Sequence, residues 1–424
     1  MHFTISENSL IGRIGSDADL EVNEVTFESL KVFANQLDAT QILQYFVRKG
    51  QEYIGIKNYV GLLSLHNKTQ IEILPKISQD SVSARKVLTQ MLRCVSYLPF
   101  KKLPSTALQN SDLPLWEVFI GLFLEEVKTI TQKGLQRNYE PETSESNFIK
   151  GKWLMSSQFN KPRISQTQFL VESDDFSLNI LPNRILKTCL YFLKDVSSSV
   201  ENSRKISQLI PLFEGVVLLK KGQKIVYKST NQKFEYYQSA VEWAKIILNQ
   251  QSWLGQAGQS MNSSLLFPSE QLFENYISQG FGKYFVDYEV FIQKSEQFLI
   301  DNHNGQKQFQ LRPDVMIKKE NNCIIFDAKW KLIDVSASNY GIDQRDLYQL
   351  YAYGKKHEAH HLFLIYPAHS AFNSPPQPFD FDETYRLQVW PFDVSKPLSE
   401  EMTKLKYFIE RSGIQNKRFV EAIE

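Results

Sequence analysis

Two aspartates and a lysine in the last third of the chain are the residues best suited to chemistry. They lie in the run LRPDVMIKKENNCIIFDAKWK. Asp327 and Lys329 are two positions apart, so in a strand they project from one face, roughly 6.6 Å apart along the backbone. Asp314 is predicted to lie in the preceding antiparallel strand. The five-residue connection between the two strands is short enough for a hairpin that brings Asp314 near Asp327. We therefore expect two carboxylates and one ammonium at the end of a buried strand.

These groups suit metal-assisted hydrolysis of a phosphodiester. Carboxylate oxygens are ligands for Mg²⁺, which keeps several waters and also accepts phosphate oxygens. A metal held by Asp314 and Asp327 would supply a nucleophilic water and neutralise the phosphate, while Lys329 would orient the water or stabilise the phosphate. A solvated strand end explains the bare pattern equally well, so the prediction depends on the flanking residues.

Two flanking features fit the same site. Glu274 lies in a predicted helix, in QLFENYI, and Gln349 and Tyr353 lie four positions apart on one face of a later predicted helix, in DLYQLYAYG. Without a functional role, Glu274 would be an exposed helix glutamate and Tyr353 would be a core residue. The combination is more specific than any of its parts, because all of these residues occur in order within about 80 positions.

The combined pattern resembles the PD-(D/E)xK nuclease superfamily, here as Pro313-Asp314 and Asp327-Ala328-Lys329. In many members an acidic residue of the first helix completes the metal site, and a subset carries a QxxxY motif that supports the active site or the DNA backbone. The resemblance therefore implies a metal site formed by Asp314, Asp327 and Glu274. It implies that the catalytic set also includes Lys329, Gln349 and Tyr353.

The elements that must position these residues follow from periodicity. Ser269 is predicted to cap a helix whose buried side carries Leu272, Phe273, Tyr276 and Ile277. An αβββαβ order is completed by strands at 284–292, about 309–317 and 323–329, a helix at about 343–357 and the strand HLFLIYP. The Gly-, Ser- and Gln-rich stretch 255–270 is predicted to be a linker at the last domain boundary.

The rest of the chain predicts two further regions. Residues 1–80 alternate short β-like runs with polar turns, and helical spacing dominates residues 83–133, 183–193, 201–210 and 238–250. The predicted fold class is α+β: a β-rich N-terminal module, a mainly helical middle or stalk region with a basic hairpin, and an α/β restriction-endonuclease-like domain. The predicted domains are 1–80, 81–255 and 256–424.

Composition limits the function classes. The chain has 424 residues and a net charge of +1, so two or three domains are expected and overall basicity gives no argument for nucleic-acid binding. Two lysine-rich stretches without acidic residues, 149–164 and 216–234, could neutralise phosphates or merely be solvated loops. Three cysteines fit neither a zinc site nor a disulfide framework, and no apolar run is long enough for a membrane span. We expect a cytoplasmic protein.

Other segments resemble the McrC family, the nuclease subunit of McrBC-type, 5-methylcytosine-specific restriction systems. The segment YVGLLSLHNKTQIEILPKI resembles its first strand pair, and GLQRNYEPETSESNFIKGKW and LPNRILKTCLYFL resemble its middle region. The segment MNSSLLFPSEQLFENYI resembles its entry into the nuclease domain. The likeness preserves the order of segments over most of the chain.

This resemblance implies a subunit that does not act alone. Family members join a hexameric AAA+ GTPase, McrB, stimulate its GTP hydrolysis through the N-terminal region, and cut double-stranded DNA. GTP would be bound by the partner, and this chain has no G-x-x-x-x-G-K-[ST] phosphate loop. The implied function is a Mg²⁺-dependent endonuclease subunit of a modification-dependent restriction complex.

Two other functions stay open. One is a free-standing nuclease of the RecB-like type; a Cas4-like version is disfavoured because the chain lacks an iron-sulfur set of cysteines. The other is a non-cutting activator or assembly subunit of a GTPase ring. The intact set of Asp314, Asp327 and Lys329 argues against the latter.

Overall fold

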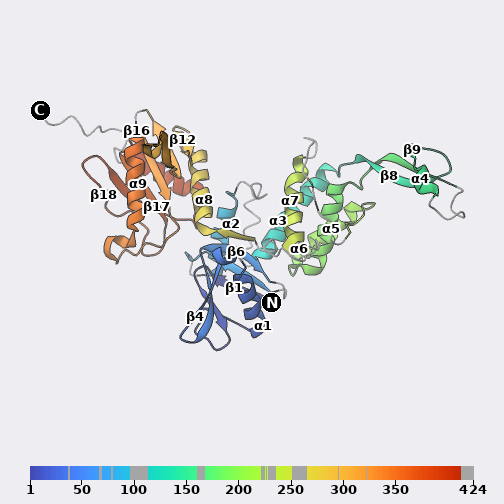
Figure 1. Cartoon of the computed structure of the whole chain (residues 1–424), viewed down its shortest axis with the longest axis horizontal. Helices are drawn as coiled ribbons and strands as arrows, with labels where there is room; N and C mark the ends of the chain where they lie inside the picture. Colours follow the sequence, from blue (N-terminus) through green and yellow to red (C-terminus); the bar gives the residue numbers. More distant parts are fainter. Residues whose placement is uncertain are drawn as a thin grey trace. The chain divides into compact units, whose positions relative to one another are not determined.

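The structure is a computed structural model that describes residues 1–36, 39–65, 69–77, 80–95, 113–159, 168–220, 225, 227, 235–250, 265–294, 296–320 and 322–411. Its contacts divide the chain into two compact units (Figure 1). The first unit combines Met1–Asp112 with Leu265–Glu424, and the second is Leu113–Ser264. The division into domains 1–80, 81–255 and 256–424 stays a prediction, because one compact unit can contain more than one domain.

The N-terminal part of the first unit is rich in strands, which form two four-stranded sheets ordered β1-β7-β6-β11 and β3-β2-β5-β4. The strands are β1 (His2–Ser6), β2 (Leu10–Arg13), β3 (Leu20–Val22), β4 (Leu43–Arg48), β5 (Gln51–Ile56), β6 (Tyr59–Ser64), β7 (Gln70–Leu74) and β11 (Leu265–Pro268). Two helices accompany them, α1 (Glu24–Ala34) and α2 (Ser81–Leu92). We call residues 1–95 the N-terminal module.

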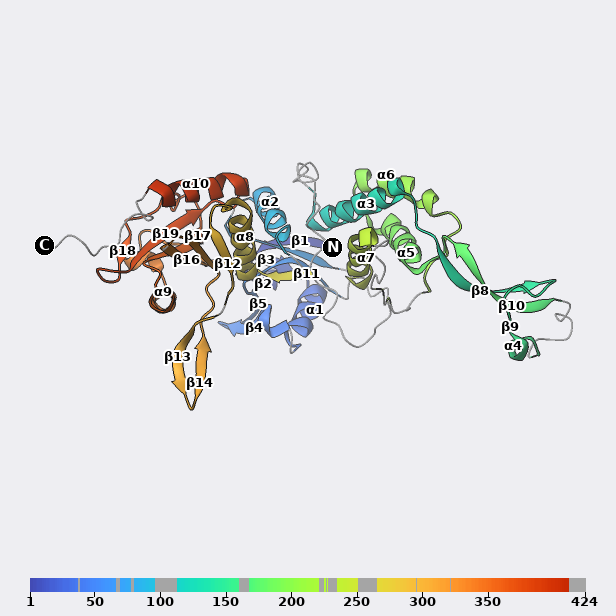
Figure 2. The same ribbon diagram turned by 90° about the horizontal axis from the view of Figure 1, so that it is seen from above.

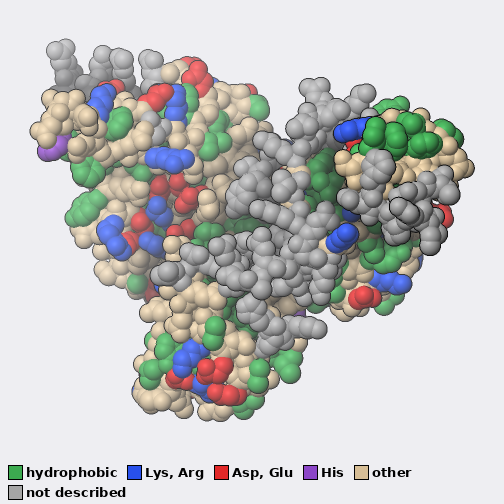
Figure 3. All heavy atoms as spheres, turned by 45° about the vertical axis from the view of Figure 1, so that its right-hand side comes forward, with side chains coloured by type: hydrophobic (Ala, Val, Ile, Leu, Met, Phe, Trp, Pro, Cys, Tyr) green, Lys and Arg blue, Asp and Glu red, His purple; other side chains and the backbone are tan. Residues whose placement is uncertain are grey.

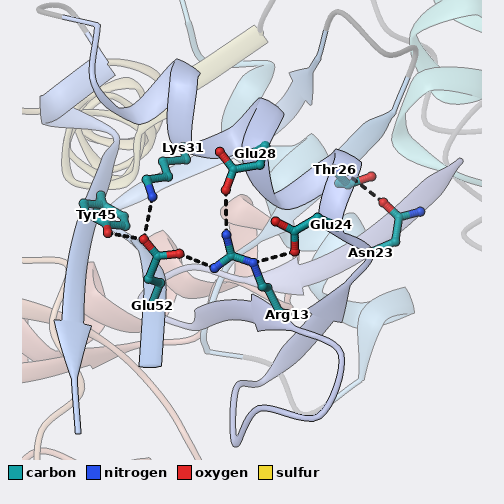
Figure 4. Close-up of polar contacts among 8 residues, drawn as sticks. All are labelled: Arg13, Asn23, Glu24, Thr26, Glu28, Lys31, Tyr45 and Glu52. Atoms are coloured by element: carbon teal, nitrogen blue, oxygen red, sulfur yellow. Dashed lines mark hydrogen bonds and ion pairs between the residues drawn. The ribbon is translucent and has the colours of Figure 1, made fainter. Parts of the chain in front are cut away.

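Helix α1 was not predicted from the sequence. The Asn23 side chain caps it by accepting a hydrogen bond from the Thr26 N–H, and Phe27 and Leu30 bury one face. Arg13 of β2 lies over the Phe27 ring, 4.1 Å from its centroid. A charged network, drawn in Figure 4, fastens α1 to the neighbouring strands. We call it the Arg13 cluster; it consists of Arg13, Glu24, Glu28, Lys31, Tyr45 and Glu52.

The C-terminal part of the first unit has a six-stranded sheet ordered β12-β15-β16-β17-β19-β18. Its strands are β12 (Glu289–Ile292), β15 (Val315–Lys319), β16 (Asn322–Ala328), β17 (His361–Pro367), β18 (Phe379–Asp380) and β19 (Arg386–Phe392). The helices are α8 (Ser269–Tyr284), α9 (Gln344–His357) and α10 (Leu398–Arg411). A separate hairpin of β13 (Phe298–His303) and β14 (Gln306–Gln310) projects from this part in Figure 2.

Helices cover both faces of this sheet, with α9 and α8 on either side of β16 and β17 in Figure 1. On one face, Ile325 belongs to a buried cluster that includes Leu350 and Tyr353 of α9. On the other face, Phe326 packs against Phe281 of α8, with ring centroids 4.5 Å apart. The strand is therefore apolar at nearly every position, as expected for a central strand buried on both sides.

Several predictions for this part are wrong in detail. Residues 284–292 do not form one strand, because α8 continues to Tyr284 and β12 begins only at Glu289. Residues 265–268 are not linker but strand β11, which pairs with β6; the rest of the predicted linker, 255–264, lies outside the described residues. Ser269 does not cap α8: Pro268 precedes the helix, and the Ser269 hydroxyl donates to Glu7.

The second unit contains most of the predicted helices and also a small sheet that was not predicted; the predicted helix near Ser83 is α2 of the first unit. Its helices are α3 (Leu115–Lys133), α4 (Met155–Phe159), α5 (Leu181–Val196), α6 (Val200–Leu209) and α7 (Glu235–Gln250). Its sheet, ordered β8-β10-β9, consists of β8 (Asn138–Ser146), β9 (Lys152–Trp153) and β10 (Phe169–Ser177). The polar sequence of β8 gave no alternation that would predict a strand. Most of the predicted basic hairpin at 216–234 lies outside the described residues.

Candidate active site

Asp327 and Lys329 form a buried ion pair at the end of β16, as their spacing predicted. The Lys329 ammonium lies 2.5 Å from Oδ2 of Asp327, and Asp327 is only 2% exposed. Burial raises the pKa of Asp327, and the Lys329 ammonium opposes that rise. Burial disfavours the charged lysine, but the carboxylates of Asp327 and Asp314 outweigh it and raise the pKa of Lys329 above its ordinary value. Lys329 is therefore a permanent cation beside Asp327.

Asp314 lies next to this pair because of the strand register. Val315 of β15 pairs with Phe326 of β16, so Asp314 comes opposite Asp327 at the next position. Its Oδ2 accepts a hydrogen bond of 2.8 Å from the Ala328 N–H. Burial, together with the charges of Asp327 and Glu274, raises the pKa of Asp314 to about 8. At neutral pH this carboxyl is mostly protonated unless a cation joins the site.

Glu274 faces the same group from α8. Burial raises its pKa; the charge of Asp327 adds to the rise and that of Lys329 opposes it. We call Asp314, Asp327, Glu274 and Lys329 the active-centre cluster, in which three carboxyl groups share one ammonium. Among the described residues, no three His, Cys, Asp or Glu side chains converge closely enough to form a metal site. The assignment of Glu274 as a third metal ligand therefore stays a prediction.

The carboxylates of Asp314 and Asp327 nevertheless suit a hard divalent cation. Oδ2 of Asp327 is buried and accepts no hydrogen bond of favourable geometry from the described residues, so its one partner there is the Lys329 ammonium. Burial, together with the charges of Asp327 and Glu274, raises the pKa of Asp314, and a cation bound beside these carboxyl groups would oppose that rise. Mg²⁺ needs only one or two protein carboxylates, because waters and phosphate oxygens fill its other positions.

Gln349 and Tyr353 of α9 support the loop that carries Asp314. The Gln349 amide donates to the Tyr353 hydroxyl at 2.7 Å, and that hydroxyl donates to the backbone carbonyl of Arg312 at 3.2 Å. Arg312 is two residues before Asp314. In this structure the pair therefore touches the backbone beside a carboxylate, and any role in catalysis stays a prediction.

Asp346 and Lys331 are two site residues that sequence reasoning missed. Asp346 is buried in the first turn of α9, and its Oδ2 lies 2.8 Å from the Lys331 ammonium. The Asp346 charge also contributes to the rise in the pKa of Asp327, behind burial. Spacing could have indicated both: Asp346 is three positions before Gln349 on one helical face, and Lys331 is two positions after Lys329.

The one face drawn in Figure 3 shows no single basic patch among its described residues. On the face drawn in Figure 3, basic and acidic side chains lie interspersed on the left-hand and lower parts. Of the two predicted basic stretches, Lys150, Lys152 and Lys220 are described and exposed. The others lie outside the described residues, namely Lys161, Arg163, Lys221, Lys224, Lys228 and Lys233. DNA contact by these stretches stays a prediction.

A comparison with known protein families tests the McrC resemblance that the sequence segments suggested. The family described as "McrBC 5-methylcytosine restriction system component" matches residues 54–367. No curated protein matches the sequence. No helix in the described part of the chain is long and apolar enough to cross a membrane.

The solved structures that are similar to this chain include the following two. One is a half-complex from a tetradecameric assembly of Thermococcus gammatolerans McrB AAA+ hexamers with bound McrC. The match has a TM-score of 0.68 and 17% sequence identity, and it covers 96% of this chain and 100% of that chain. The other is the Thermococcus gammatolerans McrBC complex. This match has a TM-score of 0.47 and 21% sequence identity, and it covers 68% of this chain and 89% of that chain. The first likeness concerns the fold, and the second is too weak to add to it. Because the family match covers most of the sequence, this chain belongs to the family of McrBC 5-methylcytosine restriction system components, and the predicted McrC resemblance is confirmed.

Proposed function

We propose that this chain is the endonuclease subunit of a GTP-dependent restriction complex and cuts double-stranded DNA with Mg²⁺. The observation that carries the proposal is the buried Asp327–Lys329 pair, with Asp314 opposite it on the neighbouring antiparallel strand. We propose that this arrangement is a PD-(D/E)xK centre, and its occurrence in a chain of the McrBC family supports that assignment.

Each residue of the active-centre cluster then has a role. Asp314 and Asp327 would hold Mg²⁺, which when bound supplies an acidified water and neutralises phosphate charge. Lys329 is held beside Asp327 and stays protonated, so it orients the attacking water or pairs with a phosphate oxygen. Glu274 adds a carboxylate that can accept a proton or a water. Gln349 and Tyr353 hold the Asp314 loop by the hydrogen bond to Arg312.

The partner is proposed to be an AAA+ GTPase ring of the McrB type. A solved structure with the same fold is described as McrB AAA+ hexamers with bound McrC. We propose that GTP binds to that partner and that the N-terminal module stimulates its hydrolysis.

Replacing Asp327 by Ala should abolish DNA cleavage by the reconstituted complex, because the main carboxylate is lost. Stimulation of the partner's GTPase should persist, since that function is assigned to another region. Asp287→Ala is the matched control: it breaks only an exposed ion pair with Lys406 and should leave cleavage unchanged. Cleavage by Asp327→Ala in the presence of Mg²⁺ would show that the site is wrong. Wild-type stimulation without any cleavage would favour the activator function.

A second test concerns the N-terminal module. Val25 and Val32 are 67% and 60% exposed on α1, so both apolar side chains are accessible to a partner. The double variant Val25→Asp, Val32→Lys should keep the fold, because it places a negative charge near the N-terminus of α1 and a positive charge near its C-terminus. It should lower stimulation of the partner's GTPase. Val200→Asp, at an 87% exposed valine of α6, is the control. Unchanged stimulation in the double variant would place the partner surface elsewhere. Because Glu7 and β6 of the module contact the C-terminal part, these substitutions test it more cleanly than deleting residues 1–80.

A further inference from the structure

We infer that Glu7, in the N-terminal module, is a positioning residue of the active-centre cluster more than 250 positions away in the sequence. One carboxylate holds both the first residue of α8, the helix that carries Glu274, and the Trp330 indole next to Lys329. The inference rests on the proposed function for its catalytic meaning. The contacts themselves do not depend on it.

Glu7 follows β1 and is 2% exposed. Its own N–H donates to the Leu74 carbonyl at 2.9 Å, which fixes its backbone to β7. Oε1 accepts hydrogen bonds from the Trp330 indole N–H at 2.7 Å and from the Lys76 N–H at 3.2 Å. Oε2 accepts one from the Ser269 hydroxyl at 2.5 Å. Donors from three separate segments thus converge on this side chain.

A buried carboxylate needs such donors, because removing its charge from water is costly. Within the described part of the chain Glu7 forms no ion pair, so hydrogen bonds are what hold it. Hydrogen bonds to an ionised carboxylate are shorter and stronger than those between neutral groups. Glu7 therefore holds three partners through one buried side chain.

Two of these partners lead directly to the active-centre cluster. Trp330 directly follows Lys329, is 1% exposed, and packs on Phe273 with ring centroids 5.2 Å apart. Phe273 is the neighbour of Glu274 in α8. A shift of the indole therefore displaces the residues on both sides of the site.

The other route runs through the start of α8. Strand β11 pairs with β6 of the N-terminal module and leads straight into the helix, and the Ser269 N–H donates to the Asn58 carbonyl at 3.0 Å. Glu274 is five residues after Ser269, little more than one turn further along the helix. The N-terminal module thus holds the end of α8 from which Glu274 projects, and Glu7 is the side chain that joins this contact to Trp330.

The test uses the full chain and its complex with the GTPase partner. Glu7→Ala and Trp330→Phe should raise deuterium uptake in residues 269–276 and 328–333. They should lower the kcat of DNA cleavage by roughly 10- to 100-fold, since small displacements at a catalytic centre are costly. KM for DNA and GTPase stimulation should stay at wild-type values. A global loss of stability would not produce this pattern.

Glu7→Gln provides the rescue. Its carbonyl oxygen can accept the Trp330 N–H, and its amide can donate to the Ser269 hydroxyl, so uptake and kcat should return close to the wild-type values. Two control variants change the same types of side chain, a buried tryptophan and a buried glutamate, away from the active-centre cluster. Trp390→Phe alters a buried tryptophan whose indole N–H has no partner among the described residues, and Glu72→Gln alters a buried carboxylate paired with Arg85. Neither should raise uptake in the two segments.

Unchanged uptake in Glu7→Ala, or an equal rise in Glu72→Gln, would overturn the positioning role. If the wild-type complex fails to cut DNA with Mg²⁺, the proposed function fails instead. The uptake comparison would still decide whether Glu7 holds Ser269 and Trp330.

Discussion

The Arg13 cluster and the active-centre cluster combine the same kinds of side chain in the first unit, yet they shift carboxyl pKa values in opposite directions. Hydrogen bonds from Lys31, Tyr45 and Arg13 lower the pKa of Glu52 to about 2. Burial and neighbouring carboxylates instead raise the pKa of Asp314 to about 8. In the Arg13 cluster, the half-buried Glu28 and Glu52 and the exposed Glu24 all have basic partners. In the active-centre cluster, three buried or half-buried acids share Lys329.

This difference separates a structural charge network from a site that is suited to bind something. The Arg13 cluster is complete, since each of its carboxylates already has a cationic partner (Figure 4). The active-centre cluster has a deficit of positive charge that a divalent ion would fill. We therefore expect the active-centre cluster, and not the Arg13 cluster, to bind a cation.

The largest effect is expected at Lys329. Lys329→Met leaves the buried charge of Asp327 without a partner, so it should destabilise the fold by about 3 to 5 kcal/mol. It should also lower cleavage by at least about 100-fold. Adding Asp327→Asn should restore most of the free energy of unfolding but no cleavage. Urea unfolding and a cleavage assay measure both, with Lys356→Met at a surface pair as control. A double variant as unstable as Lys329→Met would mean that the pair is not the cause.

Asp314 should make the metal-free protein less stable as pH rises. Its pKa is raised by burial and nearby carboxylates to about 8 in the fold, from an ordinary value of 3.8. Between these values the unfolded chain loses this proton while the folded chain keeps it, so the free energy of unfolding falls with rising pH, by at most about 6 kcal/mol. Urea unfolding between about pH 5 and about pH 8 should show this slope in the wild type. Asp314→Asn should flatten it; an equal slope in the variant would contradict the assignment.

The smallest effect is expected in the Arg13 cluster. The pKa of Glu52 is lowered by hydrogen bonds from Lys31, Tyr45 and Arg13, so its contribution is present above about pH 4.5 and is lost as pH falls toward about 2. Because Glu52 is accessible to solvent, Glu52→Gln should lower Tm only slightly at neutral pH and leave cleavage unchanged. Thermal melts at neutral and acidic pH measure this. A large loss of Tm would mean that the two clusters differ less than we infer.

Local patterns predicted β16 and α9 closely, whereas the strand expected at about 309–317 is divided between β14, which ends at Gln310, and β15, which begins at Val315. The alternation in CIIFDAK predicted a strand at 323–329, and β16 is Asn322–Ala328. The apolar spacing after Asp343 predicted a helix at about 343–357, and α9 is Gln344–His357 with Asp343 as its cap. These elements follow their sequence signals because caps and periodicity act within a few residues.

The predictions failed where distant segments decide the structure. Residues 265–268 looked like linker, but they form β11 because β6 offers them an edge to pair with. Ser269 looked like a helix cap, but its hydroxyl meets Glu7, 262 positions away. Strand β8 carries a polar sequence whose partner, β10, is also far along the chain. No local pattern contains such information.

The sequence by itself therefore determined the identity and order of Asp314, Asp327 and Lys329, the strand that carries the latter two, and the family of the chain. These follow from residue types and short spacings. Only the tertiary structure decided that the Asp346 charge acts on Asp327, that Tyr353 holds the Arg312 carbonyl, and that Glu7 holds Trp330 and Ser269. Each depends on contacts between segments that approach one another only when the core packs, and burial then sets the charge that each group carries.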